Sequence, residues 1–172
     1  MSTTAPSDAT LTALSGLSAG LWRIQELLEL LTYKLEVQHV LIETGRSRWM
    51  GRSTREIEVI LQEMREAELM RAVDAGPVCD ALGLPLDTPL TQIAEAAPAP
   101  WNQVLSEHRV ALSNATNELS LLSRSNSEML EASYKAVQET LDRFNHTSEG
   151  ATYTATGARE SRRSHHLFDQ KS

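Results

Sequence analysis

The chain has 172 residues, of which 41% are hydrophobic and 5% aromatic, and its formal net charge is −7. Such a length holds one domain, and the acidic balance disfavours binding to nucleic acid or to an anionic membrane surface. Its single cysteine, Cys79, excludes an internal disulfide, and no apolar run approaches the roughly 18 residues of a membrane span, so we expect a cytoplasmic protein without membrane insertion.

The first long segment carries an apolar stripe whose gaps alternate between three and four residues, as in a helix that keeps one face against another helix. The stripe consists of Leu14, Leu17, Leu21, Ile24, Leu28, Leu31, Leu35, Gln38 and Ile42. Gly45, just beyond it, is suited to ending a helix. We therefore predict a helix of about 30 residues, roughly 45 Å long. Residues 1–10, rich in Ser and Thr, are predicted to be disordered.

A short link, GRSRWMGR at 45–52, follows the stripe, so a second helix is expected to fold back antiparallel to the first. Ser53 and Glu56 have the spacing of a capping box. Pro77 predicts a kink or a break in this second helix, because proline lacks an amide hydrogen and clashes with the preceding turn.

Proline and glycine mark the next elements. Gly83 to Pro85 should end the second helical region, and a short helix is expected over Leu90 to about Ala96, closed by Pro98 and Pro100. The predicted fold class is all-α: an elongated antiparallel helical hairpin or bundle with a short connecting helix and a long C-terminal helix.

The long C-terminal helix begins with a second stripe: Trp101, Leu105, His108, Leu112, Ala115, Leu119 and Leu122. Two successive gaps of four residues around Asn126 form a stutter, which rotates the apolar face around the helix. The displaced face consists of Leu130, Tyr134, Val137, Leu141 and Phe144. It is either a partner-binding site or a continuation of the bundle that packs on the first helix. The helical domain is expected over 11–145, and 146–172 as a disordered polar tail.

No residue pattern indicates catalysis, a cofactor or a metal. Glu36 and His39 match half of a di-iron motif, but the sequence lacks a second copy, so His39 is interpreted as a surface or interface residue. His108 lies on the second stripe and is expected in a helix interface rather than as a base. Cys79 is interpreted as a small core residue. We therefore predict a protein that is not an enzyme.

Several segments, in this order, resemble the FlgN-type flagellar export chaperones, in the form found in high-GC Gram-positive bacteria. They are Leu21 to Leu31 (LWRIQELLELL), Lys34-Leu35-Glu36, Gly45-Arg46-x-Arg48-Trp49, Ser53-Thr54-Arg55-Glu56, Leu82-Gly83-Leu84-Pro85, Ala97-Pro98-x-Pro100-Trp101 and Thr152-Tyr153-x-Ala155-x-Gly157. The resemblance implies a cytoplasmic, non-catalytic chaperone for type III export. Its implied partners are the C-terminal helical regions of hook-associated (hook–filament junction) proteins, which it keeps monomeric, and components of the export apparatus. The resemblance also places substrate binding toward the C-terminal helix, where the displaced face lies.

Two other functions fit the residues. Trp49-Met50-Gly51, between two long helices, matches the Trp-x-Gly turn of helical-hairpin proteins secreted by type VII systems. The Tyr-x-x-x-Asp/Glu export signal of those proteins is not found in this sequence, because Tyr33, Tyr134 and Tyr153 each lack the acidic residue four positions later. A generic coiled-coil adaptor is the third possibility.

Overall fold

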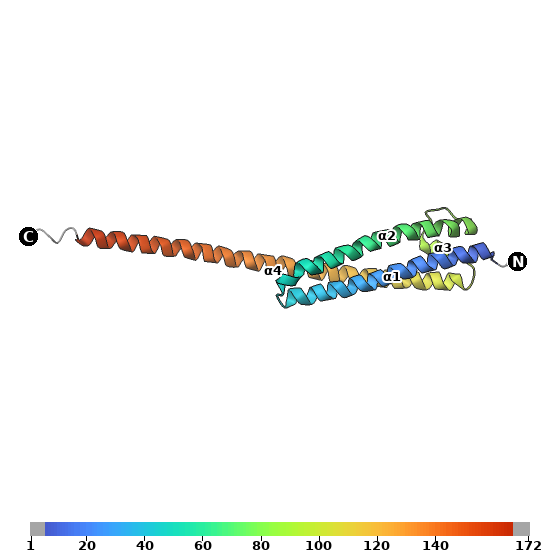
Figure 1. The fold of residues 1–172 in the computed structure, drawn as a ribbon, viewed down its shortest axis with the longest axis horizontal. Coiled ribbons are helices and arrows are strands. Elements are labelled where there is room, and N and C mark those ends of the chain that lie inside the picture. The colour runs from blue at the N-terminus through green and yellow to red at the C-terminus, as the bar shows by residue number, and fades with distance from the viewer. Residues whose placement is uncertain (1–5, 167–172) are drawn as a thin grey trace, which may run out of the picture. The chain divides into compact units, whose positions relative to one another are not determined.

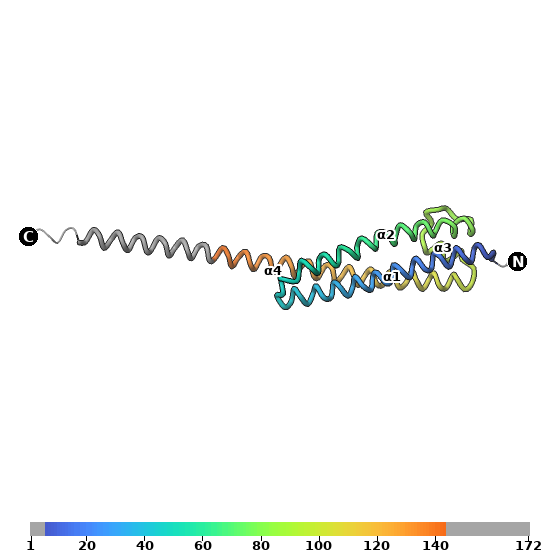
Figure 2. The backbone as a smooth tube through the Cα atoms, viewed as in Figure 1, coloured from blue at the N-terminus to red at the C-terminus, as the bar shows by residue number. Residues whose placement is uncertain are grey.

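The computed structural model describes the backbone of residues 6–166 and the side chains of residues 6–143, which are the coloured part of Figure 2. In chain order the elements are α1 (Asp8–Glu43), the 3-10 helix η1 (Ser47–Trp49), α2 (Met50–Leu82), α3 (Leu90–Ala96) and α4 (Trp101–His166) (Figure 1). No strand occurs in the described backbone, so the all-α prediction is confirmed. The chain divides into two compact units, Met1–Ser127 and Glu128–Ser172, with the boundary inside α4.

In the first unit, α1 and α2 lie side by side and run in opposite directions, as the short link predicted (Figure 1). The backbone leaves α1 at Gly45, whose φ of 64° is a conformation that glycine adopts without strain. Most of the buried residues of α1 belong to the predicted stripe, but Ser18 and Leu27 are buried outside it, and the predicted Ile42 is only half-buried. Leu27 is 2% exposed whereas the predicted Leu28 is only half-buried. Leu27 belongs to a cluster with Ile57 and Ile60 of α2, and Leu119 and Leu122 of α4 pack against it.

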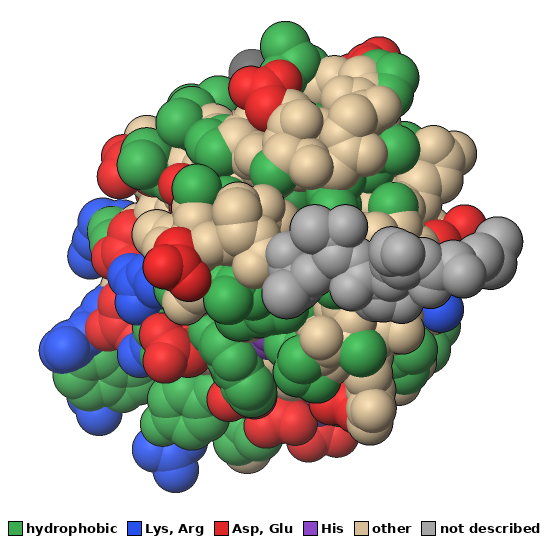
Figure 3. Space-filling view, turned by 90° about the vertical axis from the view of Figure 1, so that its right-hand side faces the viewer, with side chains coloured by type: hydrophobic (Ala, Val, Ile, Leu, Met, Phe, Trp, Pro, Cys, Tyr) green, Lys and Arg blue, Asp and Glu red, His purple; other side chains and the backbone are tan. Residues whose placement is uncertain are grey.

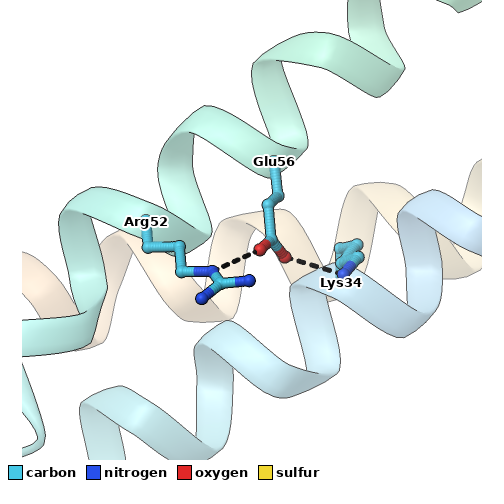
Figure 4. A network of polar contacts seen from close by, with 3 residues as sticks. All are labelled: Lys34, Arg52 and Glu56. Carbon is cyan, nitrogen blue, oxygen red and sulfur yellow. Dashed lines mark hydrogen bonds and ion pairs between the residues drawn. The ribbon is translucent and has the colours of Figure 1, made fainter.

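An ion-pair network joins α1 to α2 near the turn (Figure 4). Glu56 accepts hydrogen bonds from Lys34 Nζ of α1 at 2.7 Å and from Arg52 Nε of α2 at 2.8 Å. These two bonds, first that of Lys34 and then that of Arg52, lower the pKa of Glu56 to about 2. The predicted capping box is therefore wrong. Helix α2 begins three residues earlier than Ser53, which is buried inside the helix.

Helix α2 runs unbroken through Pro77 and ends at Leu82, where Gly83 caps it with a φ of 68°. The prediction of a break is therefore wrong. An interior proline costs a helix about 3 kcal/mol, but the next turn is held in place by the core, since Val78 and Cys79 are both fully buried. The carbonyl that loses its partner belongs to Val73, which is exposed, so water can solvate it.

The core of the first unit forms two separate clusters. The larger contains Leu14, Leu17, Leu21, Ala75, Val78, Cys79, Ile93, Ala94, Ala97 and Leu105, and the smaller contains Leu27, Leu31, Leu35, Ile57 and Ile60. Between them, residues 61–74 of α2 include no buried side chain. Viewed from the end where α1 begins, hydrophobic side chains remain visible between charged ones (Figure 3). The two clusters therefore do not enclose every apolar residue.

The ends of two helices differ from those predicted. Helix α1 begins at Asp8, three residues before the predicted start of the helical domain, and is capped by the Ser7 hydroxyl oxygen, which accepts from the Thr10 amide at 3.1 Å. The prediction for residues 1–5 lies outside the described part. The backbone of α4 continues as helix to His166, beyond position 145. The side chains of residues 144–172 lie outside the described part, and so does Phe144, so their lack of packing stays a prediction.

Candidate partner-binding surface

The short helix α3 and the prolines after it connect α2 to α4, as the sequence predicted. Helix α3 buries Ile93 and Ala94 in the larger cluster, and α4 begins at Trp101. Its residue Leu105 is fully buried in the same cluster. The first turns of α4 are therefore held against α1 and α2 by apolar contacts.

His108 continues this attachment with polar contacts. It is 3% exposed; its Nε2 lies 2.9 Å from Ser18 Oγ, and its Nδ1 lies 2.9 Å from Gln25 Nε2, both on α1. The amide of Gln25 donates to Nδ1, so Nε2 carries the hydrogen and donates to Ser18. This arrangement uses the neutral ring, and burial lowers the pKa of His108. His108 is therefore an interface residue, as predicted.

Asn126 makes the corresponding contact at the other end of α1. It is 2% exposed; its Nδ2 donates to the Leu35 carbonyl at 2.9 Å and to Gln38 Oε1 at 3.3 Å. Its Oδ1 accepts from His39 Nδ1 at 2.8 Å. Every polar atom of the Asn126 side chain thus has a partner on α1. The single arrangement that satisfies them all fixes how α4 is aligned with α1.

These contacts define a parallel register between α1 and α4, because residues later in α1 meet residues later in α4. The bonded pairs are separated by 83 to 91 positions. The last of these contacts is at Asn126, next to the end of the first unit at Ser127. The register therefore describes α4 only as far as Asn126.

The predicted face after Asn126 belongs to the second unit, and its described members are all exposed. The exposed fractions are 40% for Leu130, 67% for Tyr134, 57% for Val137 and 51% for Leu141. Because the spacing alternates between four and three residues, they share one side of α4. The four described residues of the predicted site are thus brought together as an exposed apolar stripe.

Polar residues beside this stripe bond within α4. Gln138 Nε2 donates to Tyr134 Oη at 3.1 Å, and Arg143 pairs with Glu139 at 3.8 Å, each across one helical turn. Such pairs stabilise a helix by about 0.2–0.5 kcal/mol each. They support the helical conformation of a segment that has little apolar packing to hold it.

Other parts of the described structure do not favour a chemical site. A cavity of about 400 Å³ lies among α1, α2 and α4 and the α2–α3 connection. Its lining mixes apolar side chains with polar ones, and its arginine, Arg71, already pairs with Glu68 at 3.0 Å. Glu36 is exposed, and His39 is bonded to Asn126. Within residues 6–143, no three His, Cys, Asp or Glu residues are grouped as a metal site would require. None of the described helices is long and apolar enough to cross a membrane.

Sequence reasoning missed two features. The bonds from Ser18 and Gln25 to His108 join residues about 85 positions apart, and only the folded register reveals them. A second apolar stripe on α1, formed by Leu30, Tyr33, Val37 and Val40, is also exposed. Its spacing of three, four and three residues was readable from the sequence, but the stronger core stripe on the same helix obscured it.

Comparison with protein families gives one match: the model described as "FlgN protein" covers residues 13–161, which is most of the chain and includes all five residues of the predicted site. Neither the curated proteins nor the solved structures gave a match. The matched range extends from the first core stripe of α1 through the exposed stripe of α4. The chain therefore belongs to the FlgN family of flagellar export chaperones.

Proposed function

We propose that this protein acts in the cytoplasm as a chaperone for hook-associated proteins of the hook–filament junction. It binds their C-terminal helical regions and keeps them monomeric until export. The observation that supports this proposal is the exposed stripe Leu130, Tyr134, Val137 and Leu141 on a helix of a FlgN-family protein. Phe144 extends the stripe in the sequence. An amphipathic client helix would bury its apolar side against this stripe, in the manner of helix-in-groove recognition.

In this mode the chaperone covers the apolar side of the client helix. A client whose apolar helical face is covered cannot use that face to associate with another copy. Components of the export apparatus are proposed as later partners, which receive the loaded chaperone. The stripe needs no cofactor for this role, because burial of apolar surface supplies the affinity.

Co-purification tests the assignment. The full chain serves as bait in a flagellated cell, and we expect a junction protein to be recovered with it. Tyr134→Ala and Phe144→Ala, singly and together, should abolish recovery while changing the free energy of unfolding by less than about 1.5 kcal/mol. For Tyr134 the reason is that its side chain is exposed and contributes little to folding. The matched control is Leu121→Ala, which removes an apolar residue of α4 that is 70% exposed and lies off the stripe.

Three outcomes are informative. Loss of the junction protein with the stripe variants but not with Leu121→Ala supports the site. Normal recovery with folded stripe variants contradicts it, and unfolding of these variants would show that the stripe is part of a core. Fractionation addresses the type VII alternative, because a chaperone stays in the cytoplasm whereas a secreted hairpin protein accumulates in the medium.

A further inference from the structure

Helix α1 has an exposed apolar side in addition to its buried one. We call Leu30, Tyr33, Val37 and Val40 the outer stripe; their exposed fractions are 42%, 56%, 37% and 53%. At the helical repeat of about 100° per residue, they face away from the buried Leu27, Leu31 and Leu35. An amphipathic helix of a globular protein normally presents polar residues on this side. Packing within the first unit therefore does not explain why these positions are apolar.

One edge of the outer stripe is acidic. Glu29, Glu36 and Glu43 recur every seven residues, directly before Leu30, Val37 and Thr44, and all three are exposed. We call them the glutamate row. Among the described side chains, residues 6–143, none of the three forms an ion pair. A row of like charges along an apolar stripe is the arrangement by which coiled-coil helices select a partner of opposite charge.

The opposite edge carries cations that are already used. Arg23 pairs with Glu63 of α2 at 2.9 Å, and Lys34 pairs with Glu56 at 2.7 Å while lying 5.6 Å from the centre of the Tyr33 ring. These contacts neutralise the positive charge on that side. The uncompensated charge beside the outer stripe is therefore negative.

This charge pattern disfavours a second copy of the chain as the occupant. In an antiparallel pair the two glutamate rows would face each other and repel. In a parallel pair Glu29 and Glu36 would face Lys34 and Leu41 of the other copy, and Glu43 is the last residue of α1, so no α1 residue would face it. Leu41 cannot pair with a carboxylate, and Lys34 already pairs with Glu56. Neither orientation supplies cations for the three glutamates.

We propose that the outer stripe and the glutamate row form a second docking surface, which binds a basic amphipathic helix of another protein. The partner helix places its apolar side chains on Tyr33 and Val37 and its Lys or Arg side chains against the glutamate row. This surface is separate from the stripe on α4 and does not depend on the function proposed for that stripe. The protein thus has one apolar face with an acidic edge in its first unit and another apolar face in its second.

A designed peptide provides the test. The probe is a three-heptad helical peptide with Leu at the a and d positions and Lys along both edges; its partner peptide has Glu in place of Lys. Binding to the full chain is followed by fluorescence anisotropy. The Lys peptide should bind and the Glu peptide should not. Tyr33→Ser with Val37→Ser should weaken binding of the Lys peptide, whereas Tyr134→Ala should leave it within about twofold.

A matched pair of charge variants separates local from overall attraction. Replacing Glu29, Glu36 and Glu43 together by Gln should weaken binding of the Lys peptide about tenfold, the effect of three exposed ion pairs. The control replaces Glu58, Glu95 and Glu118 by Gln. These residues are also exposed and lie elsewhere, so net charge changes equally, and binding should weaken by less than twofold.

Several results would overturn this proposal. Equal weakening by the two triple variants would mean that only net charge attracts the peptide, and equal binding of the Glu peptide would mean that charge does not select the partner. Loss of binding with Tyr134→Ala would move the site to α4. A concentration-dependent dimer in sedimentation that Val37→Asp abolishes would assign the outer stripe to a second copy.

Discussion

Replacement of Asn126 by alanine tests whether polar contacts hold α4 on α1. The variant loses three hydrogen bonds, to the Leu35 carbonyl, Gln38 and His39. The bonds to Gln38 and His39 are lost in full. The loss of the third bond costs less, because the Leu35 carbonyl lies inside α1 and keeps its partner within that helix. At about 1 kcal/mol a bond, the expected cost is about 2–3 kcal/mol.

Helix propensity works in the other direction, since alanine is favoured over asparagine in a helix interior by about 0.5 kcal/mol. The free energy of unfolding should therefore fall by about 2 kcal/mol. The matched control is Asn117→Ala, at an exposed position of the same helix, which should raise stability slightly. Urea denaturation followed by circular dichroism measures both. If the two variants agreed within about 0.5 kcal/mol, the Asn126 contacts would contribute nothing and could not fix the register of α4 on α1.

Three other predictions concern the core, pH and the C-terminal segment. Leu27→Ala should lower the free energy of unfolding by about 3 kcal/mol and Leu28→Ala by about 1 kcal/mol, because only Leu27 is fully buried; similar losses in urea denaturation would contradict the assigned core. Because burial lowers the pKa of His108, the folded state holds its ring neutral. The contribution of His108 to the free energy of unfolding should be fully present above its ordinary pKa, near 6.5, and should be lost as the pH falls from there through the lowered pKa of the folded state. His108→Gln should remove this pH dependence from denaturation curves. Deletion of 147–172 should leave the melting temperature nearly unchanged in calorimetry, since this stretch has few apolar residues to bury.

Local sequence rules were sufficient for most of the fold. The alternation of three and four residues located α1 and the start of α4, and Pro98 and Pro100 separated α3 from α4. The local rule failed at Pro77, where the buried Val78 and Cys79 outweigh the cost of an interior proline. The capping rule also failed at Ser53, because α2 begins at Met50, three residues before the predicted cap.

The residues of the candidate site could be predicted from the sequence, but the contacts of the neighbouring Asn126 could not. Spacing alone identified Leu130, Tyr134, Val137 and Leu141 as one face, and their exposure agrees with a surface role. The sequence suggested that a rotation at Asn126 would turn this face away from α1. The structure shows Asn126 itself buried and bonded to α1, one residue before the first unit ends at Ser127. A contact between residues about 90 positions apart cannot be read from a local sequence pattern.

The division of the core into two clusters has a consequence for how the first unit opens. With no side chain fully buried over residues 61–74 of α2, few apolar contacts transmit cooperativity from one cluster to the other. The turn end around Ile57 and Ile60 can then unfold locally while the end around Val78 stays folded. Amide hydrogens of α2 near the turn would exchange with solvent before those around Val78. The hairpin thus behaves as two regions of different local stability, and a partner that binds the folded surface near the turn would stabilise the weaker one.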